Sequence, residues 1–188
     1  ALSAFAPLAI DFYLPAFPAM ALAFGTDEQH VQVTLAAYFL GLSIGQLVYG
    51  PIADRFGRRV PLLTGVVLFT VASLACAFAP NLDWLIGARF VQALGGCAGM
   101  VISRAIVSDK CDAVGSAKVF SQLMLVMGLA PILAPMLGGL LVNTTGWQSI
   151  FLVLTGFSAL AAVAVAMGLP ESMPADMPRQ PLSGSLRQ

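Results

Sequence analysis

The chain has 188 residues, of which 59% are hydrophobic and only 10% are charged. Soluble domains carry about 25% charged residues, so a surface facing water is excluded and we expect an all-α integral membrane protein. Nine basic and nine acidic residues balance one another, and the three cysteines are widely spaced. These features disfavour a nucleic-acid partner, a disulfide framework and a metal site, and no cofactor is expected.

Six apolar stretches follow one another along the chain. A hydrocarbon core about 30 Å thick needs roughly 20 apolar residues at 1.5 Å each. Stretches of this length lie at about 1–24, 31–53, 60–79, 82–107, 119–142 and 147–169. Their polarity does not alternate as barrel strands would, so one bundle of six transmembrane helices is predicted over 1–169. Residues 170–188 are rich in Pro, Ser, Gln and Arg, which is typical of a polar linker.

Two of these stretches carry an ionisable residue, Asp11 in the first and Arg89 in the fourth. A charge at the centre of a membrane helix costs at least about 2.5–3.5 kcal/mol. Helical rise places Asp11 roughly 15–18 Å and Arg89 roughly 11 Å below the outer surface. We expect both to face one interior cavity, as a direct or bridged pair whose carboxylate exchanges protons; a static pair that only orients helices is the alternative. Pro15 and Pro18 predict a bend just after Asp11.

Small residues form possible seams in the second and fourth stretches, where Gly41–Gly45 and Gly95–Gly99 contain GxxxG. We interpret both as sites of close helix packing. The first also matches the GxSxG pattern of hydrolases. The single histidine, His30, lies thirteen residues from Ser43 along the same predicted helix, roughly 20 Å away. Proton transfer between them is excluded, and we predict that the protein is not an enzyme.

Orientation follows from the basic residues, eight of which fall on one side of the predicted bundle. They are Arg55, Arg58, Arg59, Arg104, Lys110, Lys118, Arg179 and Arg187. The opposite junctions contain Asp27, Glu28 and Asp83 and no lysine or arginine. By the positive-inside rule the basic side is cytoplasmic, so both ends of the chain, including the linker, are expected in the cytoplasm.

Several motifs resemble those of the major facilitator superfamily. Residues 50–59, GPIADRFGRR, match the family's loop signature GxxxDxxGRR, and 11–16, DFYLPA, resemble the first-helix DxYLPA motif of bicyclomycin-resistance-type drug:proton antiporters. Residues 89–95, RFVQALG, resemble RxxQGxG with looser glycine spacing. Residues 128–139, GLAPILAPMLGG, resemble the antiporter motif, with Ala134 in place of a glycine. Residues 146–151, GWQSIF, resemble GWRxxF, with Gln148 in place of the arginine.

The resemblance implies the amino-terminal six-helix half of a twelve-span fold, built from two inverted three-helix repeats. The linker would then lead to a missing carboxy-terminal half. The implied function is proton-coupled multidrug efflux, a drug:H⁺ antiport by alternating access in the cell inner (plasma) membrane. The implied partners are a small apolar or cationic drug-like substrate, protons and the lipid bilayer. A metabolite or sugar carrier of the same superfamily, or a six-helix fragment that transports nothing, are the alternatives.

The resemblance also implies functional residues. Proton coupling falls to Asp11 and Arg89. The substrate cavity is expected to be lined by Tyr13, Tyr38, Gln46, Gln92, Met124 and Met127. A cytoplasmic loop latch is expected to comprise Gly50, Asp54, Arg55, Gly57, Arg58 and Arg59. The antiporter helix carries Pro131, Pro135, Gly138 and Gly139, which predict a bent helix with a tight seam against a partner.

Overall fold

The structure is a computed structural model that describes residues 5–110 and 113–168. Its elements are α1 (Phe5–Asp11), the 3₁₀ turn η2 (Leu14–Ala16), α2 (Phe17–Phe24), α3 (Glu28–Phe56), α4 (Arg59–Ala77), α5 (Leu82–Lys110), α6 (Ala113–Thr145) and α7 (Gln148–Gly168). Six helical stretches within these ranges are long and apolar enough to cross a membrane: 5–24, 28–56, 59–77, 82–107, 117–145 and 148–167. The predicted all-α fold with six spans is confirmed.

The helices extend further into the polar junctions than the apolar stretches alone suggest. The predicted apolar stretches end at 107 and begin again at 119, whereas α5 continues to Lys110 and α6 begins at Ala113. Lysine and alanine favour helix, so an apolar span readily gains polar helical turns where it leaves the bilayer. Cys111 and the predicted linker over 170–188 lie outside the described residues.

The first span is interrupted directly after Asp11, as the prolines predict. The amide of Phe12 still donates to the carbonyl of Leu8 at 3.0 Å, but the amide of Tyr13 donates to Ile10 at 3.1 Å. This tighter bond passes over the carbonyl of Ala9, which in a regular helix would accept from Tyr13. The interruption therefore leaves a backbone acceptor in the middle of a membrane span without a partner from its own helix.

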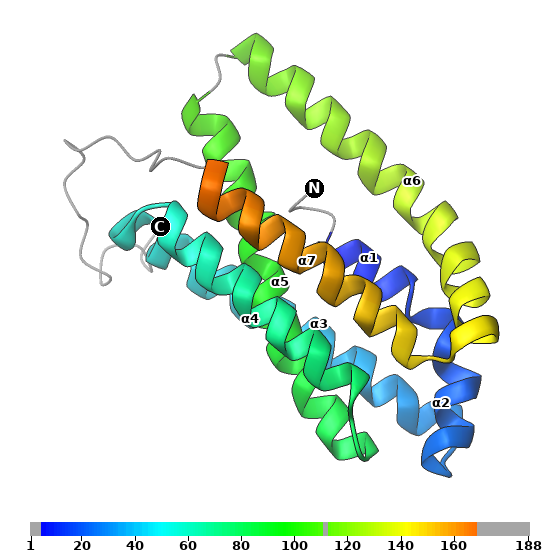
Figure 1. Ribbon diagram of the computed structural model, residues 1–188. Coiled ribbons are helices and arrows are strands. Elements are labelled where there is room, and N and C mark those ends of the chain that lie inside the picture. The colour runs from blue at the N-terminus through cyan, green and yellow to red at the C-terminus, as the bar shows by residue number, and fades with distance from the viewer. Residues whose placement is uncertain (1–4, 111–112, 169–188) are drawn as a thin grey trace.

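The bundle is organised around α5, which packs between α3 and α4, while α4 also packs against α7 (Figure 1). Glycines allow these close approaches. A Cβ on Gly41 would lie 2.5 Å from the carbonyl oxygen of Phe90, and one on Gly45 would lie 2.8 Å from the Cβ of Cys97. The structure thus supports close helix packing at the GxxxG segment of α3.

Short polar connections join the helices at both ends. Asp27 caps α3, since its side chain accepts from the amide of His30 at 2.9 Å and contacts the His30 ring nitrogen at 2.6 Å. These hydrogen bonds lower the pKa of the Asp27 carboxyl below its ordinary value. Between α3 and α4 the backbone of Gly57 has φ +86°, a conformation that only glycine adopts readily.

The helix α6 lies at the edge of the bundle and contacts α1, η2 and α7 (Figure 1). It remains helical through Pro131 and Pro135. Its buried face consists of small residues, among them Ala134 and Gly138. A Cβ on Gly138 would lie 2.5 Å from the carbonyl oxygen of Phe12. The seam predicted for this helix therefore joins it to the interruption in the first span of the same bundle.

Candidate functional site

Arg89 of α5 lies at the centre of the site, where its side chain is fully buried. Its guanidinium carbon is 4.3 Å from the ring centroid of Tyr13 and 4.2 Å from that of Tyr38. The ring of Phe151 is further away, at 5.8 Å. Aromatic faces attract cations, by about 2 kcal/mol or more when the pair is desolvated. Rings from three different spans thus hold one positive charge inside the bundle.

A directed chain of hydrogen bonds extends from the arginine. Arg89 Nη1 donates to Gln92 Oε1 at 2.7 Å, and Gln92 Nε2 donates to Ser73 Oγ at 2.7 Å. Ser73 Oγ in turn donates to the carbonyl of Phe69 at 2.7 Å. Because arginine has no acceptor atoms, it fixes which end of the Gln92 amide faces it. Gln92 therefore acts as an adaptor between the charge on α5 and the backbone of α4.

The second amino group of the guanidinium reaches the first span. Arg89 Nη2 donates to the carbonyl of Ala9 at 3.1 Å, the acceptor that the interruption after Asp11 leaves without a helical donor. A regular helix in the first span would have no such acceptor to offer. The break in the first span thus supplies the acceptor, and the buried arginine supplies the donor, of one hydrogen bond.

Asp11 is half-buried at the last position of α1, two residues beyond the carbonyl that binds Arg89. Within the described residues its carboxylate makes no hydrogen bond and no ion pair; the ion pairs described there are Asp27–His30 and Asp54–Arg58. Of the two forms expected for the Asp11–Arg89 pair, direct or bridged, the direct ion pair is not present among the described residues. The two terminal amino groups of the arginine donate instead to the Gln92 amide and the Ala9 carbonyl.

Tyr13 is fixed by a second contact, in which its hydroxyl lies 2.5 Å from Thr34 Oγ1 of α3. The Thr34 hydroxyl donates to the carbonyl of Val31 at 2.6 Å, so the tyrosine must be the donor. Tyr38 differs, because within the described residues its buried hydroxyl has no hydrogen-bond partner, and neither does Arg89 Nε. The Tyr13 hydroxyl is therefore fixed by a hydrogen bond to Thr34, whereas the Tyr38 hydroxyl can still accept or donate one.

The structure brings together four of the predicted residues, namely Tyr13, Tyr38, Arg89 and Gln92. Gln46 and Met124 lie on exposed faces of α3 and α6 and do not join this cluster. The Met127 side chain is outside the described part of the structure. Three members of the cluster were not predicted: Thr34, Ser73 and Phe151. Thr34 precedes Tyr38 by one helical turn, a spacing that places both on one face; Ser73 and Phe151 carry no comparable signal.

The predicted loop latch is built around the turn between α3 and α4. Asp54 Oδ1 accepts from Arg58 Nη1 at 2.8 Å across Gly57. Arg59 Nη2 donates to the carbonyl of Ala166 at 2.8 Å, near the end of α7. A cation at a helix C-terminus satisfies carbonyls that lack helical donors. The loop thus links α3, α4 and α7 at one end of the bundle.

Comparisons with known proteins agree with the motifs. A sequence model of the Major Facilitator Superfamily matches residues 1–186. The chain is 44% identical to an uncharacterised MFS-type transporter of Bacillus subtilis over 89% of its length and 42% of that protein. It is 35% identical to a bicyclomycin resistance protein homologue of Haemophilus influenzae, over 91% of the chain and 43% of the relative.

The fold is similar to that of a D-xylose–proton symporter, with a TM-score of 0.71 at 18% identity, over 91% of this chain and 47% of that protein. The chain therefore spans less than half the length of the relatives that it matches. A family match over nearly every residue, together with six spans in this arrangement, decides the classification. The chain belongs to the major facilitator superfamily, a family of transporters rather than enzymes, and has the fold of its amino-terminal six-helix half.

Proposed function

We propose that the chain forms half of a proton-coupled multidrug efflux transporter, with Asp11 as the proton-carrying residue. One observation carries this proposal: a carboxyl group at the interruption of a membrane span has no hydrogen-bond or ion-pair partner within the described residues. Intramembrane carboxyl groups are expensive and mark ion pathways. The resistance protein homologue among the relatives supports a drug as the exported substrate.

Arg89 has a positioning role in this proposal. Its charge is held by neutral groups, so it acts on Asp11 through space rather than as a salt-bridge partner. It also binds the Ala9 carbonyl in the same short helix as Asp11. A movement of α1 relative to α5 would change the distance between carboxyl and guanidinium, and with it the tendency of Asp11 to hold a proton.

The substrate cavity in this proposal lies between this half and a second six-helix half. Gln46 and Met124 are exposed in the chain as described, which suits residues that face a partner half or a substrate. Methionine and aromatic surfaces repack around varied apolar ligands. Transport would proceed by alternating access. We place the protein in the inner membrane with both ends of this chain in the cytoplasm and residues 170–188 as the linker.

Two other functions have some support. The structural similarity to a D-xylose–proton symporter is compatible with a sugar or metabolite carrier, although at 18% identity it bears on the fold alone. The second alternative is a six-helix fragment without transport activity. A sugar carrier would bind polar substrates and not drugs. A fragment without transport activity would release no protons when a drug or a sugar is added.

The test is proton release from the purified full-length protein when a drug is added in weakly buffered detergent solution. We expect the parent to acidify the medium, and we expect Asp11→Asn to abolish the signal while drug binding persists without pH dependence. Glu28→Gln, which neutralises an exposed acid at the end of α3, serves as the matched control and should release as many protons as the parent. Equal release from Asp11→Asn and the parent would place the coupling site elsewhere.

A further inference from the structure

Thr34 of α3 is a fully buried polar residue that none of the family motifs contains. Its hydroxyl donates to the carbonyl of Val31 at 2.6 Å and lies 2.5 Å from the hydroxyl of Tyr13. A threonine hydroxyl has one proton, so the oxygen that gives it to Val31 can only accept from the tyrosine. The Tyr13 hydroxyl is therefore bound to an acceptor whose direction is fixed by the backbone of α3.

Tyr13 lies at the interruption of the first span, two residues after Asp11 and directly before η2. Its hydroxyl is bound to Thr34 in α3, and its ring lies 4.3 Å from the guanidinium carbon of Arg89 in α5. A tyrosine side chain turns about two bonds, and contacts at both its hydroxyl and its ring face restrict that rotation. Thr34 thus helps to determine where the Tyr13 ring lies relative to the arginine.

The ring of Tyr13 is one of four groups that hold the Arg89 side chain. The other three are the Gln92 amide, the Ala9 carbonyl and the ring of Tyr38, and their contacts do not involve Thr34. A desolvated aromatic face attracts a guanidinium strongly. If the Tyr13 ring moves away, the arginine loses that attraction, and the Asp11 carboxylate in the first span becomes a better partner for its charge.

Few charged residues can act on Asp11 in place of Arg89. The helices packed against α1 are α5, α6 and α7. In its described residues, 148–168, α7 carries no charged side chain, and Lys118 of α6 lies roughly 30 Å along that helix from the turn that contacts the interruption. The other charged residues of α5 lie roughly 9 Å or more along the helix from Arg89; they are Asp83, Arg104, Asp109 and Lys110.

The neutral titratable groups near the guanidinium are the hydroxyls of Tyr13 and Tyr38 and the thiols of Cys76 and Cys97. Tyrosine and cysteine have ordinary pKa values of about 10 and 8.5 and carry no charge below about pH 7. The position of the Arg89 charge is therefore what these contacts can change at the pH where a carboxyl group exchanges its proton.

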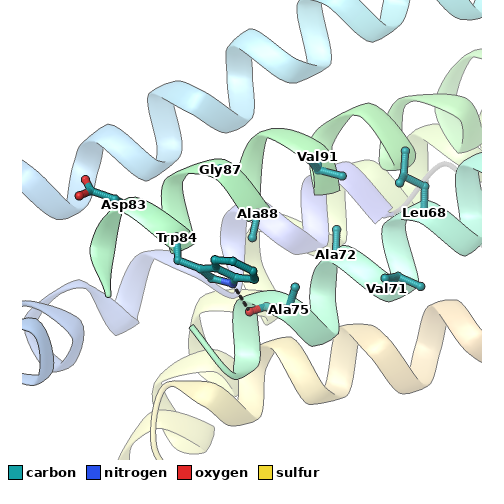
Figure 2. A pocket seen from close by; sticks show the side chains of 9 residues that line it. All are labelled: Leu68, Val71, Ala72, Ala75, Asp83, Trp84, Gly87, Ala88 and Val91. Atoms are coloured by element: carbon teal, nitrogen blue, oxygen red, sulfur yellow. Dashed lines mark hydrogen bonds between the residues drawn. The ribbon is translucent and has the colours of Figure 1, made fainter. Parts of the chain in front are cut away.

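The apolar groove between α4 and α5 takes no part in this arrangement (Figure 2). It has a volume of about 460 Å³ and is lined on α5 by Trp84, Gly87 and Val91. The indole of Trp84 donates to the carbonyl of Ala75 at 3.2 Å, as Figure 2 shows. Successive residues of a helix are rotated by about 100°, so Arg89 projects from the opposite face of α5. An effect of Thr34 on the arginine is therefore not transmitted through a molecule in the groove.

We propose that Thr34 is a positioning residue for proton coupling: its hydroxyl holds the Tyr13 ring against Arg89 and so keeps the arginine away from the Asp11 carboxylate. This role rests on the proposed function, in which Asp11 carries the proton. Without the Thr34 hydroxyl the ring is released, the guanidinium can approach Asp11, and the ionised carboxylate is favoured. Asp11 then takes up its proton at a lower pH, and the pH dependence of coupling shifts in the acid direction.

The first measurement is drug-induced proton release from the full-length protein over a range of pH. Thr34→Val removes the hydroxyl with little change of shape, and we expect its midpoint to lie about one pH unit below that of the parent, the shift that a lost cation–π contact provides. Thr34→Ser retains the hydroxyl and should keep the midpoint of the parent. Thr64→Val makes the same chemical change in α4, where the hydroxyl donates to the carbonyls of Val60 and Pro61, and should also keep it.

A second variant removes the same hydrogen bond from the other side. Tyr13→Phe leaves no buried donor unpaired, so it tests the contact even if Thr34→Val fails to fold. We expect it to shift the midpoint in the same direction, and we expect the double variant to shift it no further than either single variant, because both changes remove one interaction. Unshifted midpoints in Thr34→Val and Tyr13→Phe, or an equal shift in Thr34→Ser, would overturn the proposal.

The second measurement does not depend on Asp11. Aromatic faces shield the protons above them, so the Nε–H resonance of Arg89, identified by its loss in Arg89→Lys, should lie upfield in NMR spectra of the arginine-labelled protein. Thr34→Val should move this resonance downfield, and Thr34→Ser should not. A resonance that Thr34→Val leaves in place would overturn the positioning role whatever Asp11 does. Equal proton release by Asp11→Asn and the parent would instead refute the proposed function, and with it the coupling role of Thr34, even where the resonance moves.

Discussion

A buried arginine held by neutral groups behaves differently from one held by a carboxylate. Arg89 has hydrogen-bond partners that do not depend on Asp11, because its terminal amino groups donate to an amide and a backbone carbonyl. Because the neutral Gln92 amide accepts from Arg89, the arginine and Asp11 do not form a static salt bridge. Protonation of Asp11 then does not have to break one. The loss of an adaptor leaves a buried donor unpaired, and that is expensive in a bilayer.

Gln92→Leu should destabilise the protein by about 1–3 kcal/mol, because it leaves Arg89 Nη1 without an acceptor and Ser73 Oγ without its donor. Gln32→Leu makes the same chemical change at an exposed position of α3 and should alter stability by no more than about 0.5 kcal/mol. The measurement is the thermal unfolding midpoint in detergent. If the two variants have the same thermal unfolding midpoint, the hydrogen-bond chain through Gln92 does not stabilise the bundle.

At the scale of helices, α6 packs against the interruption of the first span. The carbonyl of Phe12 faces Gly138, and no side chain fits between them. The small buried residues Ala130 and Ala134 continue this contact along α6. The proline- and glycine-rich pattern of α6 is therefore matched to a particular break in another helix, and a change on either side should disturb both.

Gly138→Ala should destabilise the protein by about 1–3 kcal/mol, because its Cβ would overlap the Phe12 carbonyl. Gly128→Ala, in the same helix, is the control: nothing lies within 4 Å of its Cβ position, so the better helix propensity of alanine should be neutral or stabilising. The thermal unfolding midpoint and the transport rate should both fall for Gly138→Ala, and neither should fall for Gly128→Ala. Equal behaviour of the two variants would show that α6 does not rely on this contact.

At the scale of the whole molecule, two ends of one bundle have opposite chemistry. The end with the α3–α4 turn carries arginines that contact both Asp54 and the final turns of α7. Transport by alternating access requires contacts of this kind that form in one global state and break in another. The other end is acidic and carries the apolar groove between α4 and α5.

Asp54→Asn in the full-length protein should reduce transport without reducing membrane insertion, because it removes the charge that pairs with Arg58. Drug efflux from cells and the amount of protein in the membrane fraction are measured in parallel. Asp83→Asn neutralises an acid at the opposite end and should leave efflux closer to that of the parent. If Asp54→Asn leaves efflux unchanged at normal expression, the α3–α4 turn sets only the orientation of the helices in the membrane.

Cys111 provides the test of orientation. We expect a thiol reagent that cannot cross membranes to modify it in inverted vesicles but not in intact cells, because Lys110 and Lys118 flank it on the basic side. Cys76 and Cys97 are buried and should react only after unfolding, which makes the assay specific. Modification of Cys111 in intact cells would reverse the proposed topology and the location of the latch together.

The amino-acid sequence alone determined the class of fold, the number of spans and the interruption of the first one. These features depend on local properties: apolar length against bilayer thickness, and prolines that remove hydrogen bonds wherever they occur. The resemblance of residues 89–95 to a family motif also indicated Arg89 and Gln92 as site residues.

The tertiary structure alone decided what the arginine binds. The Ala9 carbonyl, Ser73 and the ring of Phe151 belong to three other helices, and the rotation and translation of each helix select them. Those placements depend on where glycines let backbones touch, as at Gly41 and Gly138. Sequence spacing predicts which residues share a helix face, but which faces meet is decided by the packing of all six spans at once.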